Sequence, residues 1–379
     1  MKKLISFCTL ALLSMQLFAQ STAVSTEQET YAVDTLLTDL VVPWSMAFLP
    51  DGSMLVTERG GKLKHFDPQT EAVKEINGLP EIYVKGQGGL FDLELHPDYE
   101  ENGWLYITHG YSDSEDGKEG NTALMRARLE GDQLVDQEVL FKGTPLRDAG
   151  QHFGGRIEFD KDGYLYLSIG DRGARENAQD PSNVLGTVMR FHDDGSIPDD
   201  NPFVNDDSKR SEIFSYGHRN PQGMAMHPET GEIWEHEHGP QGGDEINISR
   251  KGNNYGWPTI SYGINYDGTK FTDVREKEGM EQPVWYYVPS IAPCGMDFYT
   301  GDKFPNWKGD LFVGSLKFRY VERLELEGDR VISTERILED IGRIRTVREG
   351  PDGNLYVVVG APGMIVKVSP AEMSKASAE

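Results

Sequence analysis

Short apolar segments alternate with polar, glycine-containing turns along most of the chain. In six places a two-residue turn ending in Gly precedes a run of aliphatic and aromatic residues. Another short apolar segment stands before most of these turns, as residues 45–48 and 92–95 do. Strand, tight turn with Gly, and strand together indicate a β-hairpin. The six turns are Asp51-Gly52, Asn102-Gly103, Asp162-Gly163, Thr230-Gly231, Lys308-Gly309 and Asp352-Gly353.

A third apolar strand follows in several of these units, at residues 62–66, 123–127, 320–324 and 365–368. Long helical periodicity is absent. Such small antiparallel units cannot bury their own faces and must stack on one another, and a radial stack protects their edges. The sequence therefore predicts an all-β fold, a six-bladed β-propeller of four-stranded antiparallel blades. A β-sandwich or a β-helix is the alternative, but the irregular spacing favours blades.

Two longer insertions, at residues 174–211 and 253–289, interrupt the repeat. We expect them to be loops, and we expect loops rather than blades to carry the chemistry.

The N-terminus has the pattern of a secretory signal peptide. Lys2 and Lys3 precede an apolar run at residues 4–18 and then Ala19, which is a charged segment, an apolar segment and a small residue for cleavage. We expect a signal peptide at 1–19, a single propeller catalytic domain at 20–370 and a flexible tail at 371–379. The protein is then periplasmic or secreted. No later apolar run is long enough to span a membrane.

Charge and composition narrow the function. The chain of 379 residues has 62 acidic and 37 basic residues, a formal net charge of −25. Such a surface repels nucleic acid and anionic membranes. The 42 glycines lack a collagen period and agree with many tight turns. Loss of Cys8 with the signal peptide leaves Cys294, so no internal disulfide is expected.

Three polar segments are rich in Gly and contain His, and they lie at residues 150–156, 217–223 and 237–245. His152 lies between glycines just ahead of a hairpin, where a general base at a propeller mouth can stand, although a structural histidine is the alternative. His236 and His238 face the same side of a strand and allow a transition-metal pair. The Gly239-Pro240 turn instead offers backbone carbonyls, which are ligands for Ca²⁺, and acids at 244–245 can add charge there.

Three cations stand near predicted blade ends in this otherwise acidic chain. They are Lys317, Arg343 and Arg345, and the two arginines point the same way on a strand. Convergence on an anion such as a polycarboxylate is one interpretation. Solvated surface positions are the other.

These segments, in this order, resemble the soluble pyrroloquinoline quinone (PQQ)-dependent glucose/aldose sugar dehydrogenases, a family of six-bladed propellers. The resemblance runs from Pro43 to Gly360. The chain is shorter than the glucose dehydrogenase branch and resembles more closely the aldose sugar dehydrogenase branch, which implies a more open site and a broader sugar range. The matching segments are residues 86–90, 150–156, 169–171, 217–221, 237–240, 289–293, 315–317 and 343–345.

The resemblance implies roles for individual residues. His152 is the expected base, taking the proton of the anomeric hydroxyl as hydride passes to the quinone C5. Asp171 is expected to orient His152 and raise its basicity, and Arg219 to stabilise negative charge on the quinone oxygen. Gly239 and Pro240 are expected to offer backbone oxygens to Ca²⁺. The implied cofactor-binding residues are Gln87, Gln151, Arg219, Asn220, Ser290, Lys317, Arg343 and Arg345; Gln151 stands where the glucose branch has an acid.

The function so implied is that of an exported quinoprotein with PQQ and Ca²⁺, which oxidises aldose sugars to lactones and passes electrons to an unidentified acceptor. Two alternatives remain at this point. One is a Ca²⁺-dependent lactonase-type propeller, which needs carboxylate and Asn ligands converging on the axis. The other is a non-catalytic propeller that binds sugar or a protein partner.

Overall fold

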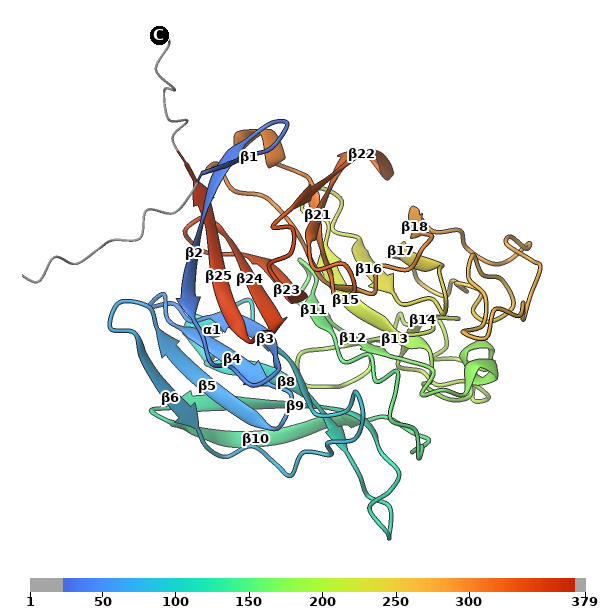
Figure 1. The fold of residues 1–379 in the computed structure, drawn as a ribbon. Coiled ribbons are helices and arrows are strands. Elements are labelled where there is room, and N and C mark those ends of the chain that lie inside the picture. The colour runs from blue at the N-terminus through green and yellow to red at the C-terminus, as the bar shows by residue number, and fades with distance from the viewer. Residues whose placement is uncertain (1–22, 372–379) are drawn as a thin grey trace, which may run out of the picture.

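Six antiparallel sheets surround a common axis in this computed structural model, which describes residues 23–371 (Figure 1). The predicted signal peptide and residues 372–379 of the predicted tail lie outside the described residues. The first blade contains β3 (Pro43–Phe48), β4 (Met54–Glu58), β5 (Lys62–Asp67) and β6 (Ala72–Ile76). The second contains β7 (Leu90–Leu95), β8 (Trp104–Tyr111), β9 (Asn121–Glu130) and β10 (Gln133–Lys142). The third contains β11 (Ile157–Phe159), β12 (Leu165–Ile169), β13 (Thr187–Phe191) and β14 (Ile213–Tyr216).

The other three blades complete the ring. The fourth contains β15 (Pro221–Met226), β16 (Ile233–Glu237), β17 (Asp244–Ser249) and β18 (Trp285–Tyr287). The fifth contains β19 (Pro293–Phe298), β20 (Leu311–Ser315), β21 (Val321–Glu327) and β22 (Arg330–Ile337). The sixth joins β23 (Arg343–Glu349), β24 (Leu355–Ala361) and β25 (Met364–Pro370) to the N-terminal strands β2 (Thr30–Leu37) and β1 (Val24–Ser25).

The sixth blade closes the ring by pairing the two ends of the chain. β2 lies antiparallel to β25, with Val33 opposite Val368. The innermost strands of successive blades contact one another all the way round, including β23 against β3. Closure of this kind leaves no unpaired sheet edge at the junction. The predicted six-bladed propeller is confirmed.

Each predicted Gly turn lies just before the second strand of a blade. Gly52 and Gly163, for example, have φ angles of 84° and 81°, in the left-handed region that Gly enters without steric cost. Helical structure in residues 23–371 is limited to α1 (Tyr99–Asn102) and two 3₁₀ turns, Arg175–Gln179 and Pro305–Trp307. None of these is long and apolar enough to cross a membrane.

The two long insertions differ from the expectation of loops alone. Residues 174–211 include β13, and residues 253–289 include β18. All five residues of β13 are buried, so this strand lacks the alternation of polar and apolar residues that marks a strand with one exposed face. β18 has only three residues. Neither strand gives a readable period in the sequence.

Apolar side chains fill the spaces between neighbouring blades. One such cluster joins Leu55 of the first blade to Leu93 and Ile107 of the second, and another packs Trp234 of the fourth blade against Phe298 of the fifth. Cys294 is buried without a disulfide. This packing holds the blades in a ring and fixes the loops at its ends.

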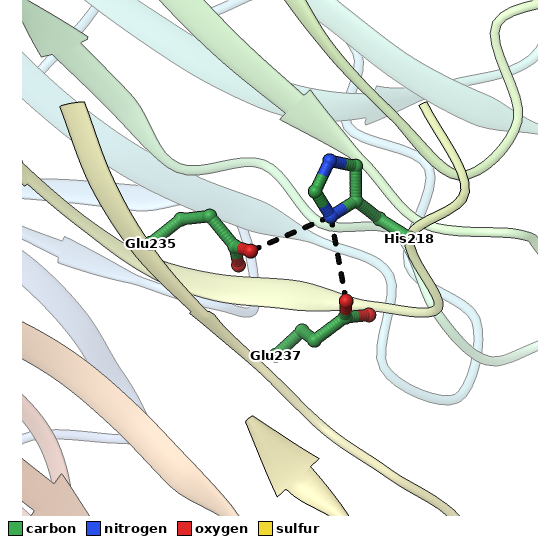
Figure 2. A group of neighbouring side chains, drawn as sticks. All are labelled: His218, Glu235 and Glu237. Atoms are coloured by element: carbon green, nitrogen blue, oxygen red, sulfur yellow. Dashed lines mark hydrogen bonds and ion pairs between the residues drawn. The ribbon is translucent and has the colours of Figure 1, made fainter. Parts of the chain in front are cut away.

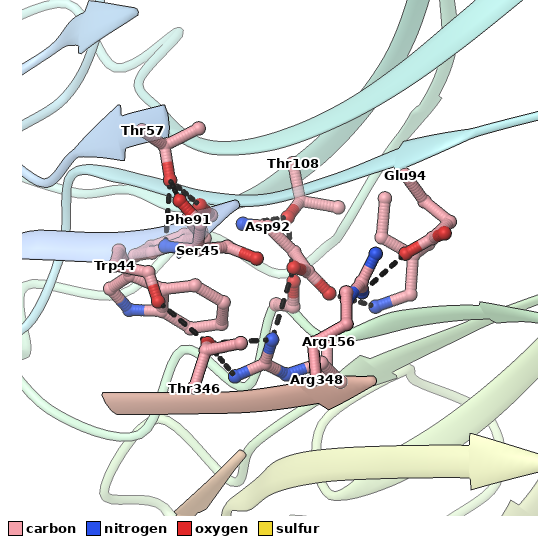
Figure 3. Close-up of polar contacts among 12 residues, drawn as sticks. Trp44, Ser45, Thr57, Phe91, Asp92, Glu94, Thr108, Arg156, Thr346 and Arg348 are labelled. Carbon is pink, nitrogen blue, oxygen red and sulfur yellow. Dashed lines mark hydrogen bonds and ion pairs between the residues drawn. The ribbon is translucent and has the colours of Figure 1, made fainter. Parts of the chain in front are cut away.

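Arg156 forms a polar junction on the axis (Figure 3). Its Nη1 lies 3.0 Å from the Asp92 Oδ1, and its Nε and Nη2 each lie 3.2 Å from the Gln222 carbonyl oxygen. The guanidinium also covers the Trp44 ring at 4.3 Å and approaches the Thr346 hydroxyl at 3.4 Å. Four other blades therefore meet the third blade at one buried, charge-paired side chain.

Candidate functional site

A cavity of about 330 Å³ opens at the end of the axis where the innermost strand of each blade begins. Every blade, or the loop that leads into it, contributes to the wall. The lining residues are Trp44, Arg59, Gln87, Phe91, Phe153, Asn220, Gln222, His238, Ala292, Leu316, Arg343 and Arg345. We call this the axial cavity.

His152 lies beside the axial cavity, in the loop between β10 and β11. Its φ of 57° is left-handed, and its backbone N–H donates to the Gln87 Oε1 at 2.8 Å. Its Nδ1 lies 2.6 Å from the Asp171 Oδ1. Because a carboxylate only accepts, Nδ1 carries the proton and Nε2 keeps a free lone pair. His152 thus has the tautomer of a general base.

Asp171 is buried and multiply hydrogen-bonded. Besides His152, it accepts the Gly173 N–H at 2.7 Å and the Trp257 indole N–H at 2.8 Å. Burial raises the pKa of Asp171, but these bonds and nearby cations outweigh burial and lower it overall. The carboxylate therefore stays ionised. Gly170 allows this approach, since a Cβ there would stand 2.3 Å from the His152 carbonyl oxygen.

The pKa of His152 is lowered rather than raised. Burial is the largest cause; Asp171 pushes the pKa upward, while Arg219 and Arg172 push it down. The expectation that Asp171 makes the ring more basic holds for that one interaction, but burial decides the net direction. The imidazole is consequently neutral at pH 7, as a proton acceptor must be.

Arg219 and Asn220 precede β15 and connect two other loops. Arg219 Nη1 donates to the carbonyl oxygens of His238 and Gly239, both at 2.8 Å. Asn220 Oδ1 accepts the Gly154 N–H at 3.2 Å. The loop that carries Arg219 thereby positions both the His152 segment and the Gly239 turn.

A buried ionic group supports that loop (Figure 2). His218 Nδ1 lies 3.4 Å from a Glu235 oxygen and 3.3 Å from a Glu237 oxygen. The other Glu237 oxygen accepts the backbone N–H groups of Arg219 and Asn220. Burial alone would lower the pKa of His218, but the two carboxylates raise it to about 9. An imidazolium therefore balances the buried acids.

This group, and not the pair His236 and His238, is where metal-ligand types converge within residues 23–371. His238 lines the axial cavity, and its Nε2 lies 2.6 Å from the Pro293 carbonyl oxygen. His236 is fully buried and burial lowers its pKa well below the usual value. His236 is thus a buried neutral ring and His238 a half-buried neutral ring in the cavity wall, each with its own surroundings.

Asp244 ties the Gly239 turn to the loop before β19. It accepts the Gly239 N–H at 2.9 Å, the Ala292 N–H at 2.8 Å and the Ser290 hydroxyl at 2.6 Å. Burial raises the pKa of Asp244 to about 6, against the effect of these bonds. Gly239 is required here, because a Cβ would stand 2.1 Å from the Gly243 carbonyl oxygen.

The cations in the wall of the axial cavity and beside it have no acidic partners. Among the described residues, Arg59, Arg219, Lys317, Arg343 and Arg345 form no ion pair with any carboxylate. The Nε groups of Arg59, Arg219 and Arg345 are buried without a hydrogen-bond partner. No Asp or Glu in the part of the chain that the structure describes lines the cavity. In a chain with 62 acids, this arrangement favours an anionic ligand.

Comparison with known proteins decides the family. A profile of the glucose/sorbosone dehydrogenase family matches residues 40–367. The chain belongs to the glucose/sorbosone dehydrogenase family.

Several relatives within this family are similar over nearly their whole length. The aldose sugar dehydrogenase YliI of Escherichia coli is 45% identical over 362 residues, which cover 93% of this chain and 97% of the relative. The crystal structure of the soluble aldose sugar dehydrogenase from E. coli in the apo-form has a TM-score of 0.85 at 42% identity, covering 90% of this chain and all of that one. The PQQ-bound aldose sugar dehydrogenase of Streptomyces coelicolor has a TM-score of 0.74 at 28% identity, covering 89% and 98%.

The family predicted from the sequence is therefore confirmed, together with the fold and the enzyme class of its relatives. Within this glucose/sorbosone dehydrogenase, most predicted site residues lie close together. Gln87, Asn220, Arg343 and Arg345 line the axial cavity. His152, Asp171, Arg219 and the Gly239 turn form its immediate surroundings through the hydrogen bonds given above.

Four predicted cofactor contacts of this dehydrogenase do not line the axial cavity. Arg219 instead donates to the Gly239 turn beside it. The Lys317 ammonium lies 4.9 Å from the Phe318 ring centre, although its neighbour Leu316 is part of the wall. The Ser290 hydroxyl is bonded to Asp244. Gln151 is exposed, and its carbonyl oxygen accepts a hydrogen bond from Arg172. Their roles stay predictions.

Other residues of the site were not predicted. Arg59 lines the cavity and donates to the Gly86 carbonyl oxygen at 2.5 Å, and Trp257 holds Asp171. Arg59 stands in an ordinary polar turn, and Trp257 in an insertion without a motif. Arg59 and Trp257 come close to the axis only because the six blades close into a ring.

Proposed function

We propose that this protein oxidises aldose sugars at the anomeric carbon to lactones, with PQQ and Ca²⁺ as cofactors. One observation carries the proposal: a neutral, carboxylate-oriented histidine stands beside a cavity walled by arginines without acidic partners. The names of the relatives, aldose sugar dehydrogenases with one PQQ-bound structure, support the same conclusion.

The residues present fit these cofactors. PQQ is a flat tricarboxylate, and the unpartnered guanidinium N–H groups of Arg59, Arg219 and Arg345 are donors for carboxylate and quinone oxygens. Arg343 would hold a further carboxylate. The carbonyl oxygens of Gly239 and Pro240 would hold Ca²⁺, which prefers oxygen ligands. Gln87, Gln151, Asn220, Ser290 and Lys317 are the remaining proposed contacts.

The chain's own residues would handle the proton. His152 Nε2 would take the proton of the anomeric hydroxyl, so that the C1–O bond becomes the lactone carbonyl as C1 loses its hydride. Asp171 would keep the ring oriented and stabilise the imidazolium that forms. Arg219 would place positive charge beside the developing negative charge. When bound, PQQ supplies the hydride acceptor and Ca²⁺ a Lewis acid.

The lactonase alternative has less support. It needs carboxylate ligands on the axis at the cavity, and no Asp or Glu of residues 23–371 lines the axial cavity. Export to the periplasm or medium remains part of the proposal, resting on the sequence at 1–19.

Reconstitution tests the proposal. Purified apoprotein should take up PQQ in the presence of Ca²⁺ and then reduce an artificial dye when an aldose such as glucose is added. Failure to take up PQQ would exclude the cofactor. Uptake without dye reduction on a panel of aldoses would exclude the reaction and leave a binding protein.

A further inference from the structure

A second groove, of about 440 Å³, lies between the fourth and fifth blades next to the axial cavity. Two loops separate the groove from the cavity and contribute to both. In the first loop Ala292 lines the cavity and Ile291 the groove; in the second, Leu316 lines the cavity and Phe318 the groove. The groove is therefore adjacent to the place where we propose that the sugar is oxidised.

Aromatic faces are presented to solvent along this groove. Tyr286 is 44% exposed and Phe318 is 41% exposed. Tyr286 is held by Tyr262, which stacks on it at 3.9 Å with an interplanar angle of 11°. Phe318 is nearly parallel to Tyr320, at 5°. Rings of this kind, large, rigid and exposed, are typical contact surfaces for the C–H faces of a ligand.

Three buried polar atoms of the groove residues lack a hydrogen bond of ordinary geometry. They are the Trp285 Nε1, the Tyr287 hydroxyl and the Glu322 Oε2. Tyr287 is 8% exposed and Glu322 is 5% exposed, so these side chains are nine-tenths or more buried. Buried polar groups without partners are rare and costly. The Tyr287 hydroxyl and the Glu322 carboxylate interact with each other, so the Trp285 indole N–H is the donor left for a hydroxyl group of a ligand.

The charges around the groove agree with a neutral polar ligand. The only cation among its lining residues is Arg336, whose guanidinium covers the Tyr320 ring at 4.6 Å and lies 3.9 Å from Glu322. Burial and Glu322 raise the pKa of Tyr287, so its hydroxyl stays a donor. A strongly anionic ligand would meet Glu322, and a purely apolar one would leave the Trp285 indole N–H unsatisfied.

We propose that this groove is a sugar subsite, which binds the non-reducing residues of an oligosaccharide whose reducing-end aldose is oxidised in the axial cavity. Aromatic stacking combined with buried hydrogen-bonding groups suits a saccharide, and the shared loops supply the continuity. The oligosaccharide role rests on the proposed function, whereas binding of the saccharide itself does not.

The test compares maltotriose and cellotriose with glucose on two variants. Tyr286→Ala removes an exposed stacking face. Ile332→Ala is the control, because Ile332 is 50% exposed on β22 of the same blade and does not line the groove. Binding to apoprotein is measured by calorimetry, and KM by dye reduction after reconstitution with PQQ and Ca²⁺.

We expect a trisaccharide to bind the apoprotein more tightly than glucose does. Tyr286→Ala should weaken trisaccharide binding and raise the trisaccharide KM about fivefold while the glucose KM stays unchanged, and Ile332→Ala should change neither. If PQQ is not taken up but Tyr286→Ala still weakens trisaccharide binding, the subsite stands and the proposed function fails. Absence of trisaccharide binding to the apoprotein would overturn the subsite, and this is the result expected if the groove binds a protein instead. Equal effects of Tyr286→Ala on the trisaccharide and on glucose would also overturn it.

Discussion

The two ends of the propeller axis have cavities of similar size and opposite character. The axial cavity measures about 330 Å³ and is walled by arginines without acidic partners. The cavity at the other end measures about 320 Å³, and Glu94, Glu158, Asp297 and Glu349 line it with Arg156 and Arg348. The same innermost strands reach both, since β23 places Arg345 in one and Arg348 in the other.

This contrast shows that net charge describes the surface and not the site. Burial among carboxylates raises the pKa of Glu158 well above its usual value and that of Asp297 to about 7. At the axial cavity, burial lowers the pKa of His238 to about 3, with Arg219 and Arg345 acting in the same direction. One end is thus arranged to accept an anion and the other to repel it.

Substitutions at the two ends of the axis should differ most in their effect on turnover. His152→Ala should lower aldose-dependent dye reduction about 10²–10⁴-fold, because the proton acceptor is lost, while PQQ uptake is retained. Glu158→Gln at the opposite end is the matched control and should keep turnover. Unchanged turnover in His152→Ala would exclude its role as the base.

Substitutions of Arg345 and Arg348, two arginines of β23, should have different effects on the affinity for PQQ. Arg345→Ala removes from the axial cavity a guanidinium that has no carboxylate partner, and it should weaken PQQ binding by about 2 kcal/mol, or roughly 30-fold. Arg348→Ala should leave PQQ affinity unchanged. Equilibrium titration of PQQ with each calcium-loaded variant measures this, and equal losses in both would remove the distinction between the two ends.

Arg348→Ala should reduce the stability of the protein more than Arg345→Ala does, which is the reverse of their effects on PQQ affinity. Arg348 lies 2.5 Å from Glu94 with both side chains about one-fifth exposed, so Arg348→Ala leaves an acid unpaired in an acidic cavity. We expect a loss of about 2 kcal/mol in the free energy of unfolding, measured with urea. Arg345→Ala has no carboxylate partner to leave behind and should cost less. A larger loss in Arg345→Ala would contradict this account.

The smallest effect concerns pH. The folded state keeps a proton on Asp297 up to about pH 7, while the unfolded state loses it near pH 4, so stability from this group falls as pH rises between these values. Asp297→Asn keeps an acceptor for the Glu349 N–H and removes this dependence. The free energy of unfolding is measured with urea at pH 4.5 and 6.5. Between these values the advantage of the variant over the unmodified protein should grow by up to about 1 kcal/mol per pH unit.

The contribution of His238 to stability should change with pH in the opposite direction. Its pKa of about 3 in the folded state lies below the usual value near 6.5, so its contribution to stability is lost as pH falls through that range. His238→Gln should therefore lose less stability on acidification. The same slope in both variants would contradict the electrostatic difference between the ends.

The blades were predictable because their signals are local. A turn such as Asp162-Gly163 and the strand after it fix one hairpin within a few residues. β13 escaped prediction because it is buried on both faces and its polar residues, Thr187 and Arg190, do not alternate with apolar ones. Residues with a motif, such as His152, were found by resemblance. The group of His218, Glu235 and Glu237 was not, since its chemistry arises only when the loop before β15 meets β16.

The central claim is that the arginine-walled end of the axis is where the cofactor binds and the sugar reacts. Titration of PQQ into calcium-loaded apoprotein, followed by addition of glucose and dye, tests it most directly in the unmodified chain and in the Arg343→Ala/Arg345→Ala variant. We predict uptake and glucose-dependent dye reduction in the first and at least a 30-fold weaker affinity in the second. Equal PQQ affinity in both proteins would contradict the claim.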